Sequence, residues 1–502
     1  MEQYLLGIDV GTTGAKALLF STSGAFLAQA YAAYPLSTPQ LGWQEQRAED
    51  WWDAVVQTVR SVCGDPAVAR NVISLSLSTQ GGTFVPVDAH GHALRPAIVW
   101  SDSRTQQERD AFLREVGPAE TMYQKTGWPL GLALLAQDIR WMRTHEPELF
   151  SKTALFLSVP SFLSYRMTGI AACDLSNAGI DQLCDVRKGC YDEQLLQFAG
   201  VRASQLPALV RSGEPIGHLT PAAAKTLGLE TGCVLIAGAH DQYAAALGAG
   251  MTHDGDILIG SGTCWVVTML RSCSDFSSGL AQSVSAVPGL WGTLLSLPTG
   301  GVCLDWLRRN IARGESGDPL SYETLNREIA LRRAGTDGLF FVPFQAHAGG
   351  QAFTRASWIG MDLSHDRFHL ARAVMEGVAF QIRWMLEDFP RVPADSVLKL
   401  TGGASKSAVW SQIVADVIGA PVCIPALADL ACVGAAALAG TGAGIYPDTA
   451  AAHAALAIRE RIIRPSPDAA ACQTAYEAYK TSVLALAAAC RHTSADSMKG
   501  VF

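Results

Sequence analysis

The feature that most restricts the fold of this chain is a strand–bend–strand pattern that occurs twice, about 250 residues apart. In the first copy the apolar runs 5–8 and 17–20 flank a polar bend, and in the second the run 257–267 is interrupted by a similar bend. The residues of the two bends are Asp9, Gly11, Thr12, Thr13, Gly14 and Lys16, and then Gly260, Ser261, Gly262 and Thr263. Each copy predicts a β-hairpin. Together they suggest a duplicated α/β domain, although any long α/β chain can contain two such hairpins.

The bends have the composition of a phosphate site. Glycines let backbone N–H groups approach an anion closely, threonine hydroxyls can donate hydrogen bonds, and Asp9 can hold a Mg²⁺ ion through water. The first bend is not a Walker A loop, because that motif leads from a strand into a helix, whereas here a second apolar run follows. Considered alone, an ordinary hairpin with a polar bend accounts for these residues equally well.

Composition narrows the class of protein. The 502 residues exceed the size of a single core and predict two domains. The net charge of −8, without a dense Lys/Arg cluster, argues against a nucleic-acid partner. The twelve cysteines include no C-x-x-C pair and are expected to be reduced thiols. The N-terminus lacks a basic region, and the uncharged run 430–447 is glycine-rich and short for a membrane span. We therefore expect a cytoplasmic protein without membrane contact.

Asp241 is the best candidate for a catalytic base. It follows the apolar run 234–238 and precedes an alanine-rich segment, so its carboxylate is expected at a helix N-terminus, where the helix dipole favours the ionised form. An aspartate here is also an ordinary helix cap, and the neighbouring His240 carries no catalytic signal of its own. A third glycine-rich bend, 401–407, follows an apolar strand and precedes a helix over 408–418. Its glycines can line a nucleotide site or serve packing alone.

Two polar loops follow apolar strands in the first half of the chain. The strand 73–78 runs into a glycine-rich loop, and the strand 97–100 runs into a loop with both charge signs. Because α/β folds place ligands at strand ends, these loops are candidates for a ligand site. The residues singled out are Gln80, Trp100, Asp102 and Arg104.

In order and spacing, these segments resemble the FGGY carbohydrate kinases over nearly the whole chain. The resemblance is carried by segments 9–13, 241–242, 260–263 and 402–407, and the family's C-terminal signature is matched by 356–361, 369–370 and 373–376. The N-terminal signature is imperfect, because Asp138 stands where the family usually has Lys. The common Glu-Arg-x-Pro-x-Trp stretch is also missing near Gly349, Gly350, Gln351 and Ala352.

The resemblance implies an α/β fold with two actin-like (ribonuclease H-like) ATPase domains around a central cleft. The N-terminal domain, residues 1–247, would bind the sugar and carry the first phosphate hairpin, and the C-terminal domain, residues 248–502, would bind ATP. Closure of the cleft would exclude water and limit ATP hydrolysis. The implied cofactors are ATP and Mg²⁺, the partners are small molecules, and a homodimer is among the assemblies left open.

The resemblance also assigns roles to individual residues. Asp241 would accept the proton of the acceptor hydroxyl, and Asp9 would hold the metal. The residues expected to contact the nucleotide are Gly11, Thr12, Thr13, Lys16, Gly260, Gly262, Thr263, Gly402, Gly403, Ser405 and Lys406. The residues expected around the sugar are Gln80, Gly81, Gly82, Trp100, Asp102, Arg104, Asp241 and Gln242.

The expected acceptor is a pentulose, with D-xylulose first and D-xylulose 5-phosphate as its product. Glycerol kinases carry Arg-Glu, and xylulokinases usually Met-His, where this chain has Gly81 and Gly82. The sequence therefore predicts a roomier pocket without a clamp for glycerol. The pair Asp241-Gln242 is, conversely, glycerol-kinase-like. Alternatives are a kinase for ribulose, erythritol or glycerol, an actin-like or chaperone-like ATPase, and a catalytically silent sugar sensor. The retention of Asp9 and Asp241 argues against the silent sensor.

Overall fold

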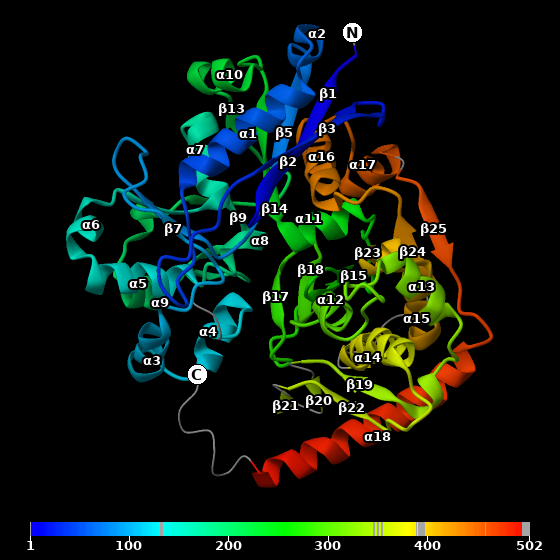
Figure 1. The fold of residues 1–502 in the computed structure, drawn as a ribbon. Coiled ribbons are helices and arrows are strands. Elements are labelled where there is room, and N and C mark those ends of the chain that lie inside the picture. Colours follow the sequence, from blue (N-terminus) through cyan, green and yellow to red (C-terminus); the bar gives the residue numbers. More distant parts are fainter. Residues whose placement is uncertain are drawn as a thin grey trace. The chain divides into compact units, whose positions relative to one another are not determined.

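The computed structural model describes residues 2–130, 134–344, 347–348, 351–352, 355–387, 389, 397–456 and 458–493. The chain divides into two compact units, whose elements are labelled in Figure 1. The first unit consists of Met1–Asp254, Leu270–Thr293 and Asp429–Ile458, and the second of Gly255–Met269, Leu294–Ala428 and Arg459–Phe502. Each unit is therefore built from three separate segments. Gly349 and Gly350, where the family stretch is missing, lie outside the described residues.

A six-stranded sheet forms the centre of the first unit. In hydrogen-bonding order its strands are β13 (Pro215–His218), β14 (Val234–His240), β5 (Val72–Thr79), β1 (Tyr4–Val10), β2 (Gly14–Ser21) and β3 (Phe26–Ala33). Strands β1 and β2 form an antiparallel hairpin, whereas β1, β5 and β14 run parallel. The carboxyl ends of these three strands therefore meet at one edge of the sheet, where β1 carries Asp9, β5 leads to Gln80 and β14 leads to Asp241.

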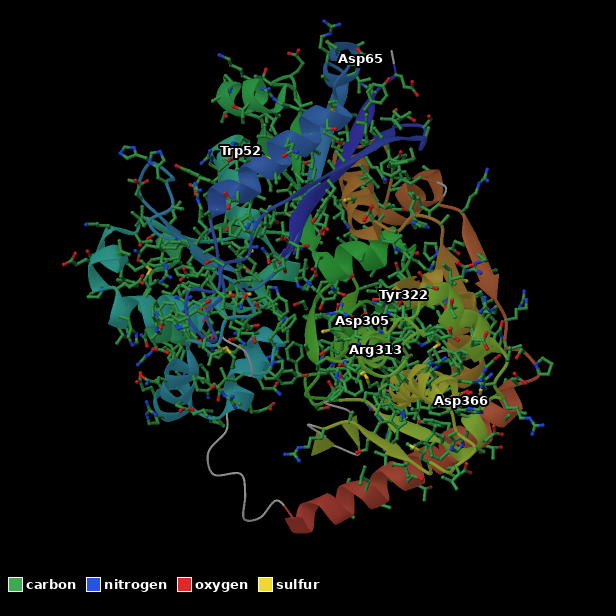
Figure 2. The ribbon with its side chains drawn as sticks, in the orientation of Figure 1. Trp52, Asp65, Asp305, Arg313, Tyr322 and Asp366 are labelled. Atoms are coloured by element: carbon green, nitrogen blue, oxygen red, sulfur yellow. The ribbon has the colours of Figure 1, made fainter. Side chains whose placement is uncertain are left out.

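Helices cover both faces of this sheet. The elements are α1 (Ala48–Val62), α7 (Val159–Thr168) and α10 (Pro221–Leu227), and then α11 (Asp241–Gly248), α16 (Leu430–Gly442) and α17 (Thr449–Leu456). Leu6 and Ile8 share a core with α1, including the buried Trp52 that is labelled in Figure 2. On the opposite face α16 approaches β1 so closely that a Cβ at Gly7 would lie 1.9 Å from the Cys432 carbonyl oxygen. Because side chains alternate along a strand, Asp9 faces the same side as Gly7.

Smaller elements complete the first unit. They are a four-stranded sheet of β4 (Glu45–Gln46), β7 (Ala97–Ile98), β6 (Phe84–Val87) and β8 (Leu155–Ser158); the pairs β9 (Ala172–Asp174) with β12 (Ala208–Val210) and β10 (Cys184–Asp185) with β11 (Cys190–Tyr191); and α2 (Pro66–Ala69), α3 (Gln106–Glu115), α4 (Ala119–Thr126), α5 (Leu135–His145), α6 (Pro147–Lys152), α8 (Leu175–Ala178), α9 (Glu193–Ala199) and η1 (Ala203–Gln205). The polar loops predicted from the sequence lie among these elements.

The strands of the second unit belong to a seven-stranded sheet. Its strand order is β17 (Ala281–Val284), β18 (Trp291–Leu297), β16 (Trp265–Arg271), β15 (Ile257–Ser261), β23 (Leu398–Gly402), β24 (Val422–Pro425) and β25 (Glu460–Ile463). Of these strands, β17 falls within Leu270–Thr293, a segment of the first unit. Here too the first strand of an antiparallel hairpin, β15 with β16, pairs in parallel with a later strand, β23. The two predicted hairpins are confirmed.

The helices and short strands of the second unit follow its sheet. They are α12 (Gly301–Asn310), α13 (Tyr322–Ala330), η2 (Thr336–Gly338), β19 (Phe340–Val342) with β22 (Ser357–Ile359), β20 (His347–Ala348) with β21 (Gln351–Ala352), α14 (Arg367–Glu387), η3 (Ala404–Lys406), α15 (Ala408–Ile418) and α18 (Ala469–Thr493). The helix predicted over 408–418 is confirmed, and the third glycine bend lies between β23 and that helix.

Candidate functional site

Asp9 lies where the first hairpin turns. Its Oδ1 accepts a hydrogen bond from Ser78 Oγ at 2.7 Å, from the parallel neighbour β5. The bend itself is closed by the Gly11 N–H, which donates to the Gly14 carbonyl at 3.1 Å. Burial raises the pKa of Asp9 to about 6; the Ser78 hydrogen bond opposes this, and the negative charge of Asp241 adds to it. Asp9 is therefore a carboxylate that a cation would stabilise.

Lys16 is held by a residue that the sequence did not reveal. It is the cross-strand partner of Asp9 in the hairpin, and its Nζ lies 2.6 Å from Asp429 Oδ1. Asp429 directly precedes α16, and the thiol of Cys432 in the first turn of that helix donates to the Lys16 carbonyl at 3.7 Å. The start of α16 thus places the Asp429 carboxylate against Lys16, which is predicted to bind phosphate.

Three of the predicted residues meet in one hydrogen-bond network. Trp100 Nε1 donates to Thr12 Oγ1 at 3.0 Å, and this hydroxyl donates to Gln80 Oε1 at 3.1 Å. Gln46, which sequence reasoning missed, accepts from Gln80 Nε2 at 3.1 Å and donates to the Thr12 carbonyl at 2.6 Å. The first phosphate bend and the predicted acceptor loop are therefore connected directly. The Trp100 side chain is 39% exposed, so its ring remains accessible.

Asp102 and Arg104 bind each other rather than standing free. The Arg104 guanidinium donates to both oxygens of Asp102, at 3.0 and 2.8 Å, and to Glu45 at 2.9 Å. It also lies 3.7 Å from the centre of the Trp43 ring. Both side chains are buried, with 1% and 0% exposure. The ion pair fixes Asp102 and Arg104, which follow Trp100 closely in the sequence. It therefore stabilises the loop that carries Trp100.

Asp138 on α5 is a buried acid near this pair. Within the described part of the chain neither carboxylate oxygen has a hydrogen-bond partner. Burial raises the pKa of Asp138 well above its usual value, and the negative charge of Asp102 raises it further, while Arg104 opposes. Where the family usually has a Lys, this chain therefore carries a buried carboxyl group that holds its proton more tightly than an exposed one does.

The space beside Gly81 and Gly82 is filled, which corrects the expectation of a roomier pocket. A Cβ at Gly81 would lie 2.6 Å from His240 Cδ2 and 2.9 Å from Ile180 Cγ2. A Cβ at Gly82 would lie 2.7 Å from Leu134 Cδ2, and Gly82 has φ +64°, a conformation that other residues adopt at a cost. The two glycines make room for side chains of this protein.

Asp241 begins α11, as the sequence predicted. β14 ends at His240 and the helix starts at the next residue. The Asp241 side chain is 33% exposed, and its Oδ1 lies 3.5 Å from His240 Nε2. Among the described residues this oxygen has no hydrogen-bond partner. Asp241 is therefore a carboxylate at a helix N-terminus with acceptor capacity left for a proton. Gln242, in the first turn of the same helix, is partly exposed.

In the second unit, Ser261 joins the second and third glycine bends. Its carbonyl accepts from the Gly403 N–H at 2.6 Å, and its hydroxyl accepts from the Ala404 N–H at 3.0 Å. Gly402 has φ +90°, and a Cβ there would lie 2.7 Å from the Ser261 carbonyl oxygen. Only glycine fits this close contact. Gly262 and Thr263 are exposed at the hairpin turn, as the phosphate prediction requires.

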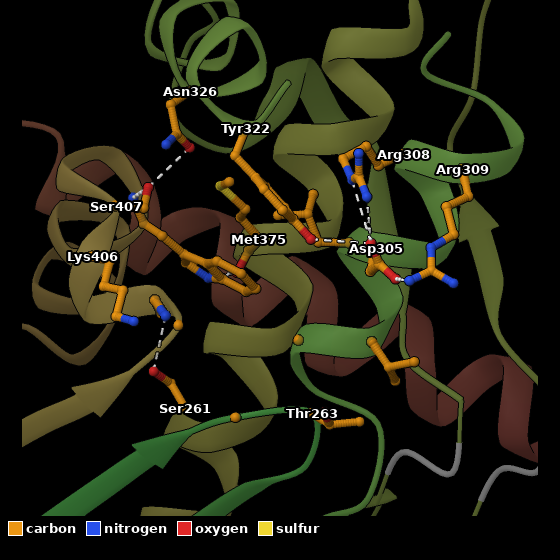
Figure 3. Close-up of a pocket in the computed structure, with 17 residues that line it drawn as sticks. Ser261, Thr263, Asp305, Arg308, Arg309, Tyr322, Asn326, Met375, Lys406 and Ser407 are labelled. Carbon is orange, nitrogen blue, oxygen red and sulfur yellow. Dashed lines mark hydrogen bonds and ion pairs between the residues drawn. The ribbon is translucent and has the colours of Figure 1, made fainter. Parts of the chain in front are cut away.

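A pocket of about 890 Å³ opens between these bends and the helices α12, α13 and α15 (Figure 3). Its wall includes four of the predicted nucleotide residues: Gly262, Thr263, Gly403 and Lys406. Of the rest, Ser405 hydrogen-bonds the Gly402 carbonyl at 2.8 Å, and Gly260 lies within β15. The volume suits a nucleotide-sized ligand.

The far wall of the pocket consists of residues that sequence reasoning missed. Asp305 Oδ1 accepts from Arg308 Nη2 at 3.0 Å and from the Tyr322 hydroxyl at 3.1 Å. Figure 3 shows this cluster beside Asn326, whose Oδ1 accepts from Ser407 Oγ at 3.0 Å. The sequence offered one signal for this cluster, the three-residue spacing of Asp305 and Arg308. That spacing predicts an ion pair on a helix but does not indicate a pocket.

The described residues include no cluster of three or more His, Cys, Asp or Glu side chains arranged for a metal ion. Over the same part of the chain, no helix is long and apolar enough to span a membrane. A metal held by one carboxylate, water and phosphate oxygens does not require such a cluster.

The repeated hairpin sheets and the glycine-lined pocket define a protein with the actin-like ATPase fold. Residues 4–248 match the N-terminal domain, and residues 255–443 the C-terminal domain, of the FGGY family of carbohydrate kinases. The chain belongs to this family and is an ATP-dependent sugar kinase.

Similar proteins act on different acceptors. Xylulose kinase of Bacillus subtilis (strain 168) is 30% identical over 452 residues, which are 88% of this chain and 89% of the relative. Glycerol kinase of Dechloromonas aromatica (strain RCB) is 30% identical over 472 residues, 89% of this chain and 91% of the relative. The crystal structure of xylulose kinase from Rhodospirillum rubrum matches with a TM-score of 0.87 and 28% identity, covering 96% of this chain and 99% of that one.

Proposed function

We propose that the protein transfers the γ-phosphoryl group of Mg²⁺-bound ATP to a hydroxyl of a pentulose, with D-xylulose the first candidate and D-xylulose 5-phosphate the product. Residues 1–247 are proposed as the sugar-binding domain and residues 248–502 as the ATP-binding domain. The likeness to xylulose kinases supports the choice of sugar, and the equal identity to a glycerol kinase keeps polyols in the test.

The observation that carries the proposal is the state of Asp241. Its carboxylate is at a helix N-terminus with 33% of the side chain exposed; the buried Oδ1 faces His240 Nε2 at 3.5 Å without a hydrogen bond among the described residues, which leaves Oδ2 for the acceptor. In the proposed step the acceptor oxygen attacks the γ-phosphorus, the bond to the β-phosphate oxygen breaks, ADP leaves, and Asp241 takes the hydroxyl proton. Phosphoryl transfer has a loose transition state, so a carboxylate of ordinary basicity is sufficient once it is positioned.

Asp9 is the residue proposed to hold Mg²⁺. Burial, and then nearby negative charge, raise the pKa of Asp9 by more than the Ser78 hydrogen bond and the Lys16 charge lower it, so a cation would stabilise the ionised form. When bound with ATP, the ion neutralises charge on the phosphates. Lys16, on the neighbouring strand, and the N–H groups of Thr12 and Thr13 are proposed to bind and orient phosphate oxygens, while Gly11, whose N–H closes the bend, lets the phosphate approach closely.

The nucleotide itself is proposed to bind in the pocket of the second unit. Gly262, Thr263 and Gly403 leave part of the wall free of long side chains, which suits a flat base or a phosphate chain. Lys406 provides a cation, and Arg308 provides a second one that Asp305 partly neutralises.

The experiment is a coupled ADP-release assay with the purified protein, ATP and Mg²⁺. The acceptors are D-xylulose, L-xylulose, D-ribulose, erythritol, glycerol and gluconate, each tested separately. ADP release that depends on a pentulose, with the highest kcat/KM for D-xylulose, is expected. Release without any acceptor would instead support an actin-like or chaperone-like ATPase, and nucleotide or sugar binding without release would support a silent sensor.

A further inference from the structure

We propose that His240 is the residue that takes the place of the missing side chains at Gly81 and Gly82, so that it limits the length of the acceptor and positions the base Asp241. This rests on the proposed function, because it concerns the acceptor side of the same site. The family resemblance and the glycine bends do not assign any role to this histidine.

The first observation is a shared volume. A Cβ at Gly81 would lie 2.6 Å from His240 Cδ2 and 3.0 Å from His240 Nε2, distances at which two side chains cannot coexist. A long residue at 81 and an imidazole at 240 are therefore mutually exclusive. Gly81 does not have a positive φ, so the local backbone does not itself require glycine there. Two neighbours require glycine there: the imidazole ring, which comes closest at 2.6 Å, and Ile180, whose Cγ2 would lie 2.9 Å from the Cβ.

The second observation is that the ring is fixed. The backbone N–H of His240 donates to Ser176 Oγ at 2.8 Å and holds the main chain, while the ring itself packs edge-on to Trp128 at 6.2 Å and tilted against Tyr243 at 5.6 Å. Trp128 is itself anchored, because its Nε1 donates to Ser283 Oγ at 2.9 Å. With 8% of its side chain exposed, His240 has little freedom to move away from an acceptor or from a new side chain at 81.

The third observation concerns the base. His240 Nε2 lies 3.5 Å from Asp241 Oδ1, an oxygen without a hydrogen-bond partner in the described part of the chain. The imidazole Nε2 faces this oxygen, and an N–H at that position restricts the rotation of the carboxylate. The other oxygen is then directed to the acceptor. His240 lies beside the proposed base and also fills the space next to Gly81. It can therefore influence both turnover and the choice of acceptor.

Removing the imidazole ring is expected to favour longer acceptors. In His240→Ala the ratio of kcat/KM for a six-carbon acceptor to that for D-xylulose should rise about tenfold, the effect of roughly one chain carbon in a shaped pocket. The KM for ATP should stay within about twofold, since the pocket of the second unit is unchanged. His240→Asn keeps an N–H donor toward Asp241 and should retain more of the wild-type kcat than His240→Ala. His145→Ala, which removes an exposed imidazole stacked on Trp141, serves as the control for losing a histidine.

The shared volume has its own test, which needs no activity. Gly81→Met should lower the melting temperature by several degrees, because the new side chain meets the ring of His240 and Ile180. In the His240→Ala background the same substitution should lower the melting temperature by less, because only the contact with Ile180 remains. The double variant should also return the acceptor ratio toward that of the wild type. Equal cost of Gly81→Met in both backgrounds, or an unchanged acceptor ratio in His240→Ala, would overturn the proposal. If the wild type releases no ADP with any acceptor, the proposed function fails, and the melting cycle still decides whether positions 81 and 240 compete.

Discussion

Asp9→Asn should stabilise the protein while it removes activity. Burial and nearby negative charge raise the pKa of Asp9 from 3.8 to about 6, so the folded state binds this proton more tightly than the unfolded state does. The free energy of unfolding therefore falls as pH rises from about 4 to 6 and stays lower above 6. A shift of about two units corresponds to at most about 3 kcal/mol at pH 7.5. Asparagine is not ionised at any of these pH values, and its Oδ1 can still accept the Ser78 hydrogen bond.

The assay is urea unfolding of wild type and Asp9→Asn in EDTA at pH 4.5 and 7.5, since bound Mg²⁺ would hide the effect. The variant should gain about 1–3 kcal/mol at pH 7.5 and much less at pH 4.5, where Asp9 is already protonated in the folded state. Asp88→Asn is the opposite control, because hydrogen bonds from His92 and His90 lower the pKa of Asp88 and its ionised form is favourable. An equal difference at both pH values, or a less stable variant at pH 7.5, would refute the reasoning. In the kinase assay the same Asp9→Asn protein should show lower turnover and a higher Mg²⁺ requirement.

Three further outcomes are expected. Asp241→Asn should reduce turnover by about two or more powers of ten with ATP binding within a few-fold, and near-normal turnover would exclude it as the base. Gly403→Val should raise the KM for ATP about tenfold and that for the sugar far less, because its side chain would enter the pocket; Gly232→Val, with open space around it, is the control. Asp429→Asn, which breaks the ion pair with the lysine of the first hairpin, should weaken ATP use, whereas Asp192→Asn breaks a similar ion pair elsewhere and should not.

The fold could be predicted to the extent that it is determined locally. Alternating apolar residues around a glycine bend predict a hairpin because both strands and their turn are contiguous in the sequence. The helix at 408–418 and the helix start at Asp241 followed from their flanking strand and glycine signals. The division of the chain could not be predicted in the same way, because the first unit recruits Leu270–Thr293 and Asp429–Ile458 from the second half.

The candidate site was predictable where its residues sit in motifs. Asp9, Gly262 and Gly403 stand in bends whose composition suits phosphate. Asp429 could not be found in this way, because its contact with Lys16 arises from the close packing of α16 on β1 at Gly7. In the sequence it is a lone aspartate before an alanine-rich helix, which predicts only an ordinary N-cap. The same holds for the aromatic and charged wall of the pocket proposed for the nucleotide, because residues from three helices form that wall.

The acceptor loop shows why small residues do not by themselves indicate an open pocket. A glycine removes a side chain, but protein interiors are close-packed, and the removed volume is available to any neighbour that the fold brings there. At Gly81 that neighbour is His240, at the end of a parallel strand that lies beside β5 only in the folded chain. On the proposal made above, His240, next to the proposed base, sets the length of the acceptor rather than the loop of Gly81 and Gly82. It follows that inserting Arg and Glu at positions 81 and 82 would meet His240 and Leu134 before any glycerol could bind, so a change of acceptor has to begin with His240.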